Sequence, residues 1–215
     1  RNGRHIREKN YRYACEVFSK VPVKPGKKKR VGITGEIYMK CSKLGNDDIE
    51  SFLLRQGMEP YSGGFVNYCL YLVDTERYKA EKYQRNPIMA KACAFVLHRL
   101  CEAQKHLLTV IGETDRFQTD LPFPELKEKV QGILAEGCNT GDGWLIAAEV
   151  IQYVEKGCGS VLILHPFGCL VSHVCERGIL QRLHARFPDV SIQTIEYDYD
   201  QSKTLRESRI LLAIS

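Results

Sequence analysis

Val161-Leu162-Ile163-Leu164 is a short apolar run that leads directly into His165-Pro166-Phe167-Gly168-Cys169-Leu170. The apolar residues predict a buried strand, the Pro-Phe-Gly sequence predicts a turn, and a helical pattern follows. Cys169 is therefore expected at the carboxyl end of a strand and at the N-terminus of the next helix, where the helix dipole favours a thiolate. This position makes Cys169 a candidate ligand of a metal or cluster; the alternative is a small turn residue.

The last third of the chain alternates between helices and strands. Helices are predicted at 144–155, at about 171–187 and from 202 onward, and strands at 161–164 and 190–197. A first strand is predicted at 31–37 and a short edge strand within 58–65. Such alternation is typical of βαβ units in a parallel sheet. The expected fold is α/β, a Rossmann/flavodoxin-like three-layer sandwich with about four parallel strands in the order 2-1-3-4.

A helical segment interrupts this pattern. Helical spacing at about 66–136 predicts an insertion within a Rossmann-like domain that spans 31–215, and residues 1–30 are expected to form a basic helical lead-in. The chain begins at Arg1 and not at Met, so we interpret it as a fragment of a longer protein.

Composition excludes several classes of protein. The 215 residues carry a net charge of +5, and no apolar run approaches the roughly 20 residues that span a bilayer, so no membrane role is expected. The run Lys27-Lys28-Lys29-Arg30 lacks an aromatic platform or a nucleic-acid motif, which favours a solvated flank over nucleic-acid binding. Nine cysteines without disulfide-like spacing predict a reducing, cytoplasmic location.

Three predicted strand ends converge on one crevice, because open α/β sheets bind ligands at the point where the strand order reverses. The residues at these ends are Glu36 from the first strand, His165, Phe167, Gly168 and Cys169 from the third, and Glu196, Asp198 and Asp200 from the fourth. We expect them to bind a ligand or cofactor.

Several of these residues could instead have purely structural roles. Glu36 is equally consistent with a cap for the following segment, and His165 with a hydrogen bond to a backbone carbonyl. Asp198 and Asp200 resemble acids that cap the next helix more than acids that hold a cation.

A second candidate loop is Asn139-Thr140-Gly141-Asp142-Gly143-Trp144. Gly141 and Gly143 allow the backbone to approach a cofactor, and the following helix offers free N–H groups to a phosphate or carboxylate. The loop lacks the full dinucleotide-binding spacing and follows a helix, so a glycine-rich helix start without a ligand is the alternative. Trp144 is expected to anchor the core.

Four motifs together resemble a known family. They are Gly35-Glu36-Ile37-Tyr38, Gly141-Asp142-Gly143-Trp144-Leu145 with Glu149, Pro166-Phe167-Gly168-Cys169-Leu170 with His173, and Tyr197-Asp198-Tyr199-Asp200. In this order they resemble the C-terminal domain of the 2-hydroxyacyl-CoA dehydratase and benzoyl-CoA reductase component family, closest to long activase-related proteins. The family's usual Gly-Glu-Gly-Trp is Gly-Asp-Gly-Trp here, and Val171-Ser172 replaces its common Pro-Asn.

The resemblance implies an iron–sulfur protein of anaerobic metabolism. Cys169 corresponds to one ligand of a [4Fe–4S] cluster, whose other ligands come from upstream domains of the same polypeptide, so this chain alone need not hold the cluster. Cys41 and Cys138 lie in predicted loops and are candidates to approach Cys169, although neither matches a family ligand. An ATP-dependent activator module would supply electrons, and an acyl-CoA would be dehydrated or reduced, as in a lyase.

Two further hypotheses belong to other classes. One is a non-redox binding or assembly module that recognises a phosphate-bearing ligand or a partner domain at the crevice. The other is a hydrolase with a cysteine nucleophile, for which His165 and His173 are near in sequence but no acid is evidently placed to orient them.

Overall fold

A computed structural model describes residues 2–23 and 26–215 of the chain. The chain divides into two compact units. The helical unit comprises Arg1–Lys27 and Cys69–Glu125, and the sheet unit comprises Lys28–Tyr68 and Leu126–Ser215. Within the described residues, no helix is both long and apolar enough to cross a membrane.

The helical unit is built from long helices. It contains α1 (Asn2–Ser19), most of α4 (Phe65–Lys82), α5 (Pro87–Gly112) and the start of α6 (Phe123–Lys129). Helix α5 begins where its sequence predicts, because Asn86 Oδ1 accepts a hydrogen bond from the Met89 amide at 3.1 Å and Pro87 occupies the first helical position. Helix α1 packs on α5, where Arg12 pairs with Glu113.

The sheet unit contains one parallel sheet of four strands. They are β1 (Arg30–Gly35), β2 (Glu59–Ser62), β3 (Cys158–Pro166) and β4 (Ser191–Tyr197), in the order β2-β1-β3-β4. The predicted α/β fold and strand order are therefore confirmed. Strand β2 is an edge strand of the sheet. This position suits a strand that contains Pro60, because proline has no amide hydrogen to donate to a neighbouring strand.

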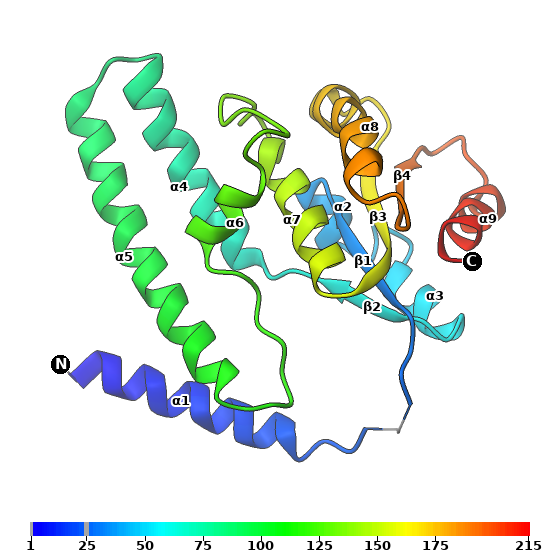
Figure 1. Ribbon diagram of the computed structural model, residues 1–215, viewed down its shortest axis with the longest axis horizontal. Coiled ribbons are helices and arrows are strands. Elements are labelled where there is room, and N and C mark those ends of the chain that lie inside the picture. Colours follow the sequence, from blue (N-terminus) through cyan, green and yellow to red (C-terminus); the bar gives the residue numbers. More distant parts are fainter. Residues whose placement is uncertain (1, 24–25) are drawn as a thin grey trace. The chain divides into compact units, whose positions relative to one another are not determined.

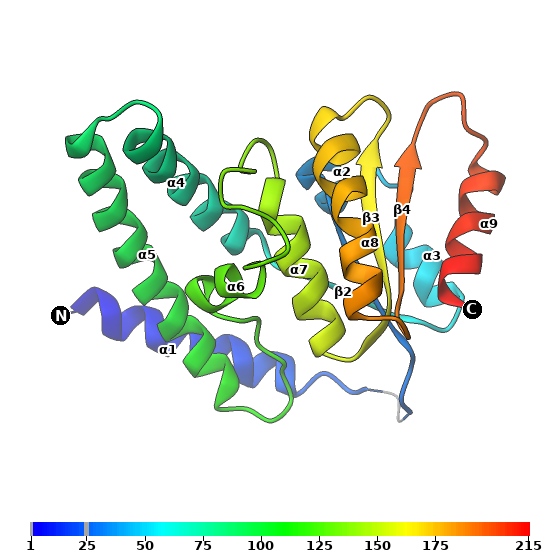
Figure 2. The same cartoon turned by 45° about the horizontal axis from the view of Figure 1, so that its top comes forward.

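Helices cover both faces of this sheet (Figures 1 and 2). On one face lie α7 (Gly143–Glu155), the π-helical turn η1 (Ser172–Glu176) and α8 (Arg177–Arg186), and on the other lie α3 (Ile49–Arg55) and α9 (Lys203–Ile214). The core on the α3 and α9 side includes Ile33, Leu53, Leu164, Ile195 and Ile210, all of which are buried. The apolar residues of β3 form a continuous buried run, Val161-Leu162-Ile163-Leu164, because this strand is packed on both faces.

The first strand ends earlier than the sequence predicts. We expected a strand at 31–37, but β1 stops at Gly35, and Ile37 begins the short helix α2 (Ile37–Cys41). Gly35 has a φ of +127°, and a Cβ atom there would lie 2.0 Å from the carbonyl oxygen of Leu164 in β3. Only glycine allows this turn so close to the neighbouring strand.

Candidate functional site

The carboxyl ends of β1, β3 and β4 form one polar edge of the sheet. The Glu36 amide donates a hydrogen bond to the carbonyl oxygen of Leu164 at 2.8 Å, which fixes the segment after β1 against β3. The Phe167 amide donates to the carbonyl oxygen of Tyr197 at 2.8 Å, which fixes the segment after β3 against β4. The strand order reverses between β1 and β3, so this is the edge at which ligands of such folds bind.

Cys169 lies directly before the helical residues Leu170 and Val171. Its carbonyl oxygen accepts a hydrogen bond from the His173 amide at 3.0 Å, and its own amide donates to Pro166 at 3.3 Å. Gly168, with a φ of +76°, makes the turn. The Ser172 hydroxyl lies 3.1 Å from the Cys169 sulfur, which is half-buried. The thiol therefore sits at the start of a helix, at the polar edge of the sheet.

The helix after Cys169 is not regular. Its second turn is the π-helical turn η1, and single π-turns are frequent at functional sites. Ser172 and Glu176 are buried on η1. Sequence reasoning missed Glu176, because its burial comes from the packing of η1 and no local spacing predicts it.

Glu149 is the centre of a buried hydrogen-bonded group. Its carboxylate accepts a hydrogen bond from the Thr34 hydroxyl at 2.5 Å and pairs with the Lys40 ammonium at 2.6 Å. The side chains of Lys40 and Glu149 are only 4% and 3% exposed. This group joins β1, α2 and α7, and it gives the buried Lys40 ammonium a carboxylate partner. Sequence reasoning named Glu149 only through the family resemblance and missed Thr34 and Lys40.

Two further buried carboxyl groups hold protons near neutral pH. Burial raises the pKa of Asp142 to about 7, and the charges of Glu36 and Glu149 act in the same direction. Burial also raises the pKa of Glu176 to about 7, with the charges of Asp142 and Glu36 adding to the effect. The Ser172 side chain acts in the opposite direction on the pKa of Glu176, but burial dominates. Both groups are thus able to exchange a proton at neutral pH.

Glu36 acts as a helix cap. Its carboxylate accepts a hydrogen bond from the Met39 amide at 2.9 Å, at the N-terminus of α2. This contact is the plainer of the two roles predicted for Glu36. The same carboxylate adds negative charge beside Asp142 and Glu176.

The glycine-rich loop lies against the helix that follows Cys169. Gly141 has a φ of +56°, and a Cβ atom there would lie 2.9 Å from the Val171 side chain. Gly143 also has a positive φ, of +37°, at the start of α7. The structure therefore brings this loop and the Cys169 segment together. Trp144 is 1% exposed, which confirms the prediction that it anchors the core.

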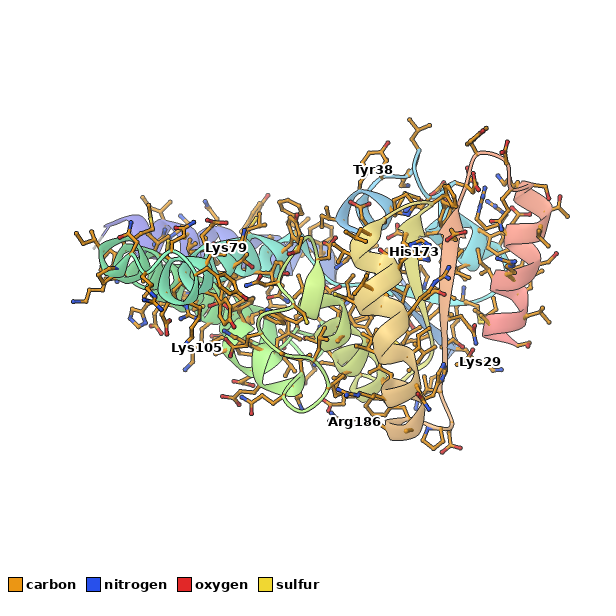
Figure 3. All side chains as sticks on the ribbon, turned by 90° about the horizontal axis from the view of Figure 1, so that it is seen from above. Lys29, Tyr38, Lys79, Lys105, His173 and Arg186 are labelled. Atoms are coloured by element: carbon orange, nitrogen blue, oxygen red, sulfur yellow. The ribbon has the colours of Figure 1, made fainter. Side chains whose placement is uncertain are left out.

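His165, His173 and Glu196 form a cluster beside Cys169. Their donor atoms all lie within 4.8 Å of one another. His165 is wholly buried, and burial lowers its pKa. His173, labelled in Figure 3, stands on η1 with its Nδ1 atom 2.8 Å from the Cys169 carbonyl oxygen. Sequence reasoning placed Glu196 at this edge of the sheet, but it did not pair Glu196 with His165, because that pairing depends on strand register.

The remaining predicted residues are more exposed. The side chain of Phe167 is 65% exposed in the turn after β3. Asp198 accepts a hydrogen bond from the Asp200 amide at 3.2 Å, which closes the turn after β4. The prediction that Asp198 and Asp200 cap the next helix was wrong, because Ser202 caps α9 through the Leu205 amide at 3.3 Å. A serine at the boundary position fits the cap geometry that the earlier acids cannot reach.

The cysteines do not gather around Cys169. Cys175 and Cys138 interact with each other, and burial together with Cys138 raises the pKa of Cys175. Cys41 lies instead near Lys40 and Glu149, and burial raises its pKa. In the part of the chain that the structure describes, His165, His173 and Glu196 are the sole group of three potential ligands at metal-binding distances. Cys169 is thus suited to supply one ligand, and not a complete cluster site.

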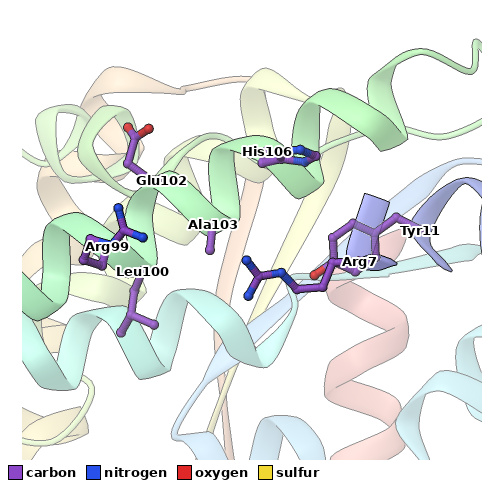
Figure 4. Close-up of a pocket in the computed structure, with 7 residues that line it drawn as sticks. All are labelled: Arg7, Tyr11, Arg99, Leu100, Glu102, Ala103 and His106. Atoms are coloured by element: carbon purple, nitrogen blue, oxygen red, sulfur yellow. The ribbon is translucent and has the colours of Figure 1, made fainter. Parts of the chain in front are cut away.

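The helical unit has a hollow of its own, between α1 and α5 (Figure 4). Its volume is about 330 Å³, and its lining includes Arg7, Tyr11, Arg99 and His106. The lining also includes one acidic residue, Glu102.

The likeness of this chain to known proteins was compared in three ways. No family model matches the sequence, and no curated protein and no solved structure matches it.

Proposed function

We propose that this chain is the C-terminal domain of a dehydratase-like, activase-related iron–sulfur protein of the cytoplasm, in which Cys169 is one ligand of a [4Fe–4S] cluster. One observation supports this most directly: a half-buried thiol stands at the carboxyl end of β3, at a helix start, with a hydroxyl 3.1 Å from its sulfur. Hydrogen bonds to ligand sulfurs tune the potential of such clusters.

The other ligands would come from outside this chain. Cys138 and Cys175 interact with each other. Among the described residues, neither of them forms a group of three potential ligands with Cys169. Upstream domains of the same polypeptide are the proposed source, and an ATP-dependent activator module is the proposed electron donor. The cluster, when bound, would supply one-electron chemistry toward an acyl-CoA, as part of a lyase.

The residues around Cys169 would shape the site. The Ser172 hydroxyl would hold the sulfur in place. Asp142 and Glu176, whose pKa values lie at about 7, would take up or release protons at the polar edge. The buried group of Thr34, Lys40 and Glu149 would keep β1 and α7 rigid beneath them.

Charge favours this function over the binding of a phosphate in the crevice. Glu36, Asp142, Glu149 and Glu176 all lie at this edge, and Lys40 is already paired with Glu149. A phosphate placed there would meet carboxylates and no free cation from the described residues of this group. The phosphates of an acyl-CoA would therefore have to lie outside the acidic crevice.

Geometry also disfavours a cysteine-nucleophile hydrolase. The ring of His173 is hydrogen-bonded through Nδ1 to the carbonyl oxygen of Cys169 and not to its sulfur. The group that does contact the sulfur is a serine hydroxyl, which is not a base at neutral pH.

Anaerobic reconstitution with iron and sulfide tests the function. The longer polypeptide and this chain would each be reconstituted, with Cys169→Ala and Cys175→Ala variants, and followed by visible absorbance and EPR. We expect a cluster in the longer polypeptide that Cys169→Ala abolishes and Cys175→Ala retains. A cluster unaffected by Cys169→Ala, or no cluster in either protein, would overturn the proposal.

A further inference from the structure

We propose that His165, His173 and Glu196 form a mononuclear binding site for a divalent transition metal such as Zn²⁺ or Fe²⁺, separate from the ligand role of Cys169. Two imidazoles and one carboxylate are the ligand set of many zinc sites and of mononuclear iron(II) sites. The site lies on the face of the sheet that η1 and α8 cover.

The strand register builds the first half of the site. His165 of β3 is the register partner of Glu196 of β4, so both side chains leave the same face of the parallel sheet side by side. The Nδ1 atom of His165 lies 4.0 Å from Oε2 of Glu196. The turn η1 then brings the Nε2 atom of His173 to 3.3 Å from the same oxygen.

These separations suit a metal ion. Ligand atoms bound to zinc at 2.0–2.2 Å are about 3.4 Å apart in a tetrahedral arrangement. The His173 and Glu196 atoms already have this separation, and the pair of His165 and Glu196 needs to close by less than about 1 Å. The two histidine nitrogens lie within 4.8 Å of each other, so the site needs to contract as an ion binds.

His173 is oriented as a ligand. Its Nδ1 atom lies 2.8 Å from the Cys169 carbonyl oxygen, which can only accept, so Nδ1 carries the proton. In a neutral ring, the lone pair of Nε2 then faces Glu196. A histidine ligand usually donates its other N–H to a carbonyl or carboxylate in this way.

His165 gives an independent indication. It is wholly buried, its Nε2 atom has no hydrogen-bond partner in the described chain, and its Nδ1 atom has only a 3.3 Å contact with the carbonyl of the next residue. The Nδ1 atom is the nitrogen that faces Glu196, so a metal bound there replaces the weak carbonyl contact of Nδ1 with a ligand bond, while Nε2 lies outside the site.

The site is open on one side. The side chains of His173 and Glu196 are 33% and 23% exposed, so an ion can enter from solvent and keep a position for water or another ligand. Arg177 competes for the carboxylate, because its guanidinium lies 3.3 Å from the same Glu196 oxygen. The Arg177 side chain is 51% exposed and can move away when an ion binds.

Titration with Zn²⁺, and with Co²⁺ as a spectroscopic probe, tests the site on the whole chain. We expect one ion per chain, a Co²⁺ spectrum without sulfur-to-metal charge transfer, and a higher melting temperature with Zn²⁺. His173→Gln and Glu196→Gln should each weaken binding at least about tenfold. Cys169→Ala should not change it, and Arg177→Gln should bind as tightly as the wild type or more tightly.

The controls separate this site from zinc bound by thiols or through Cys169. His173 and Glu196 are partly exposed, so their variants should fold, and metal-free melting temperatures would verify this. Three outcomes would each overturn the proposal: no saturable binding, a sulfur-containing Co²⁺ spectrum, or a loss in Arg177→Gln as large as that in Glu196→Gln. Loss of the iron–sulfur cluster function in Cys169→Ala with retained Zn²⁺ binding would show that the two sites are independent.

Discussion

The ammonium of Lys40 in α2 lies 2.6 Å from the carboxylate of Glu149 in α7, although 109 residues separate them in sequence. Both side chains are almost completely buried. The Thr34 hydroxyl also donates a hydrogen bond to the Glu149 carboxylate. The three side chains therefore connect β1 to α2 and α7. A buried pair of this kind contributes little net stability, but removing one partner leaves a buried charge.

Lys40→Met should therefore lower the free energy of unfolding by about 3–5 kcal/mol, because Glu149 would remain buried without its cation. Urea denaturation followed by circular dichroism measures this. The double variant Lys40→Met/Glu149→Gln removes the charge as well and should recover a large part of the loss. Equal stability of the single and double variants would contradict the assigned role of the pair.

Gly35→Ala should prevent normal folding or lower the free energy of unfolding by more than about 3 kcal/mol. The new Cβ atom would meet the Leu164 carbonyl oxygen at 2.0 Å, at a φ of +127°. Gly159→Ala is a matched control in β3, because a Cβ atom there has nothing within 4 Å. Its effect should stay within about 1 kcal/mol, and comparable losses for both variants would contradict the explanation.

The free energy of unfolding should fall as the pH rises from about 5 to 8. Asp142 and Glu176 have a folded pKa of about 7, above that of an unfolded carboxyl group, so the folded state binds more protons in this range. Their stabilising effect is complete below the unfolded pKa and is lost as the pH passes the folded one. We expect a loss of about 2 kcal/mol for each of the two groups, relative to Asp142→Asn/Glu176→Gln.

Denaturation curves at four pH values across this range measure the effect. The amide variants cannot ionise, so their curve should be flatter. Asp189→Asn, at an exposed position, should keep the wild-type slope. Parallel pH profiles for the wild type and the double variant would show that these carboxyl groups are not the cause.

Glu36→Ala should cost about 1 kcal/mol at pH 5, because the variant loses the hydrogen bond from the Met39 amide that caps α2. The cost should be smaller at pH 8, because the negative charge that raises the pKa of Asp142 is also removed. Unfolding experiments at the two pH values measure the difference. Glu36→Gln keeps an acceptor oxygen but removes the negative charge. A larger loss of unfolding free energy at pH 8 than at pH 5 in both variants would contradict this account.

Much of the fold follows from local signals. The apolar runs in β1 and β3 and the helical periodicity between them predict a parallel sheet, because each strand is buried on both faces. Asn86 and Pro87 predict the start of α5, and the Pro-Phe-Gly turn predicts that Cys169 begins a helix. The end of β1 was misplaced by two residues, because Glu36 caps a helix that apolar spacing alone does not distinguish from a strand.

The amino-acid sequence by itself determined the strand order, the Cys169 turn and the core position of Trp144, since each depends on contacts or backbone preferences within a short segment or on general rules of chain connection. Only the tertiary structure decided which polar groups meet. Strand register places Glu196 beside His165, packing buries Asp142 and Glu176, and Lys40 reaches Glu149 across the sheet edge. Burial and long-range proximity set the charge and the partners of these groups, and neither is encoded in local spacing.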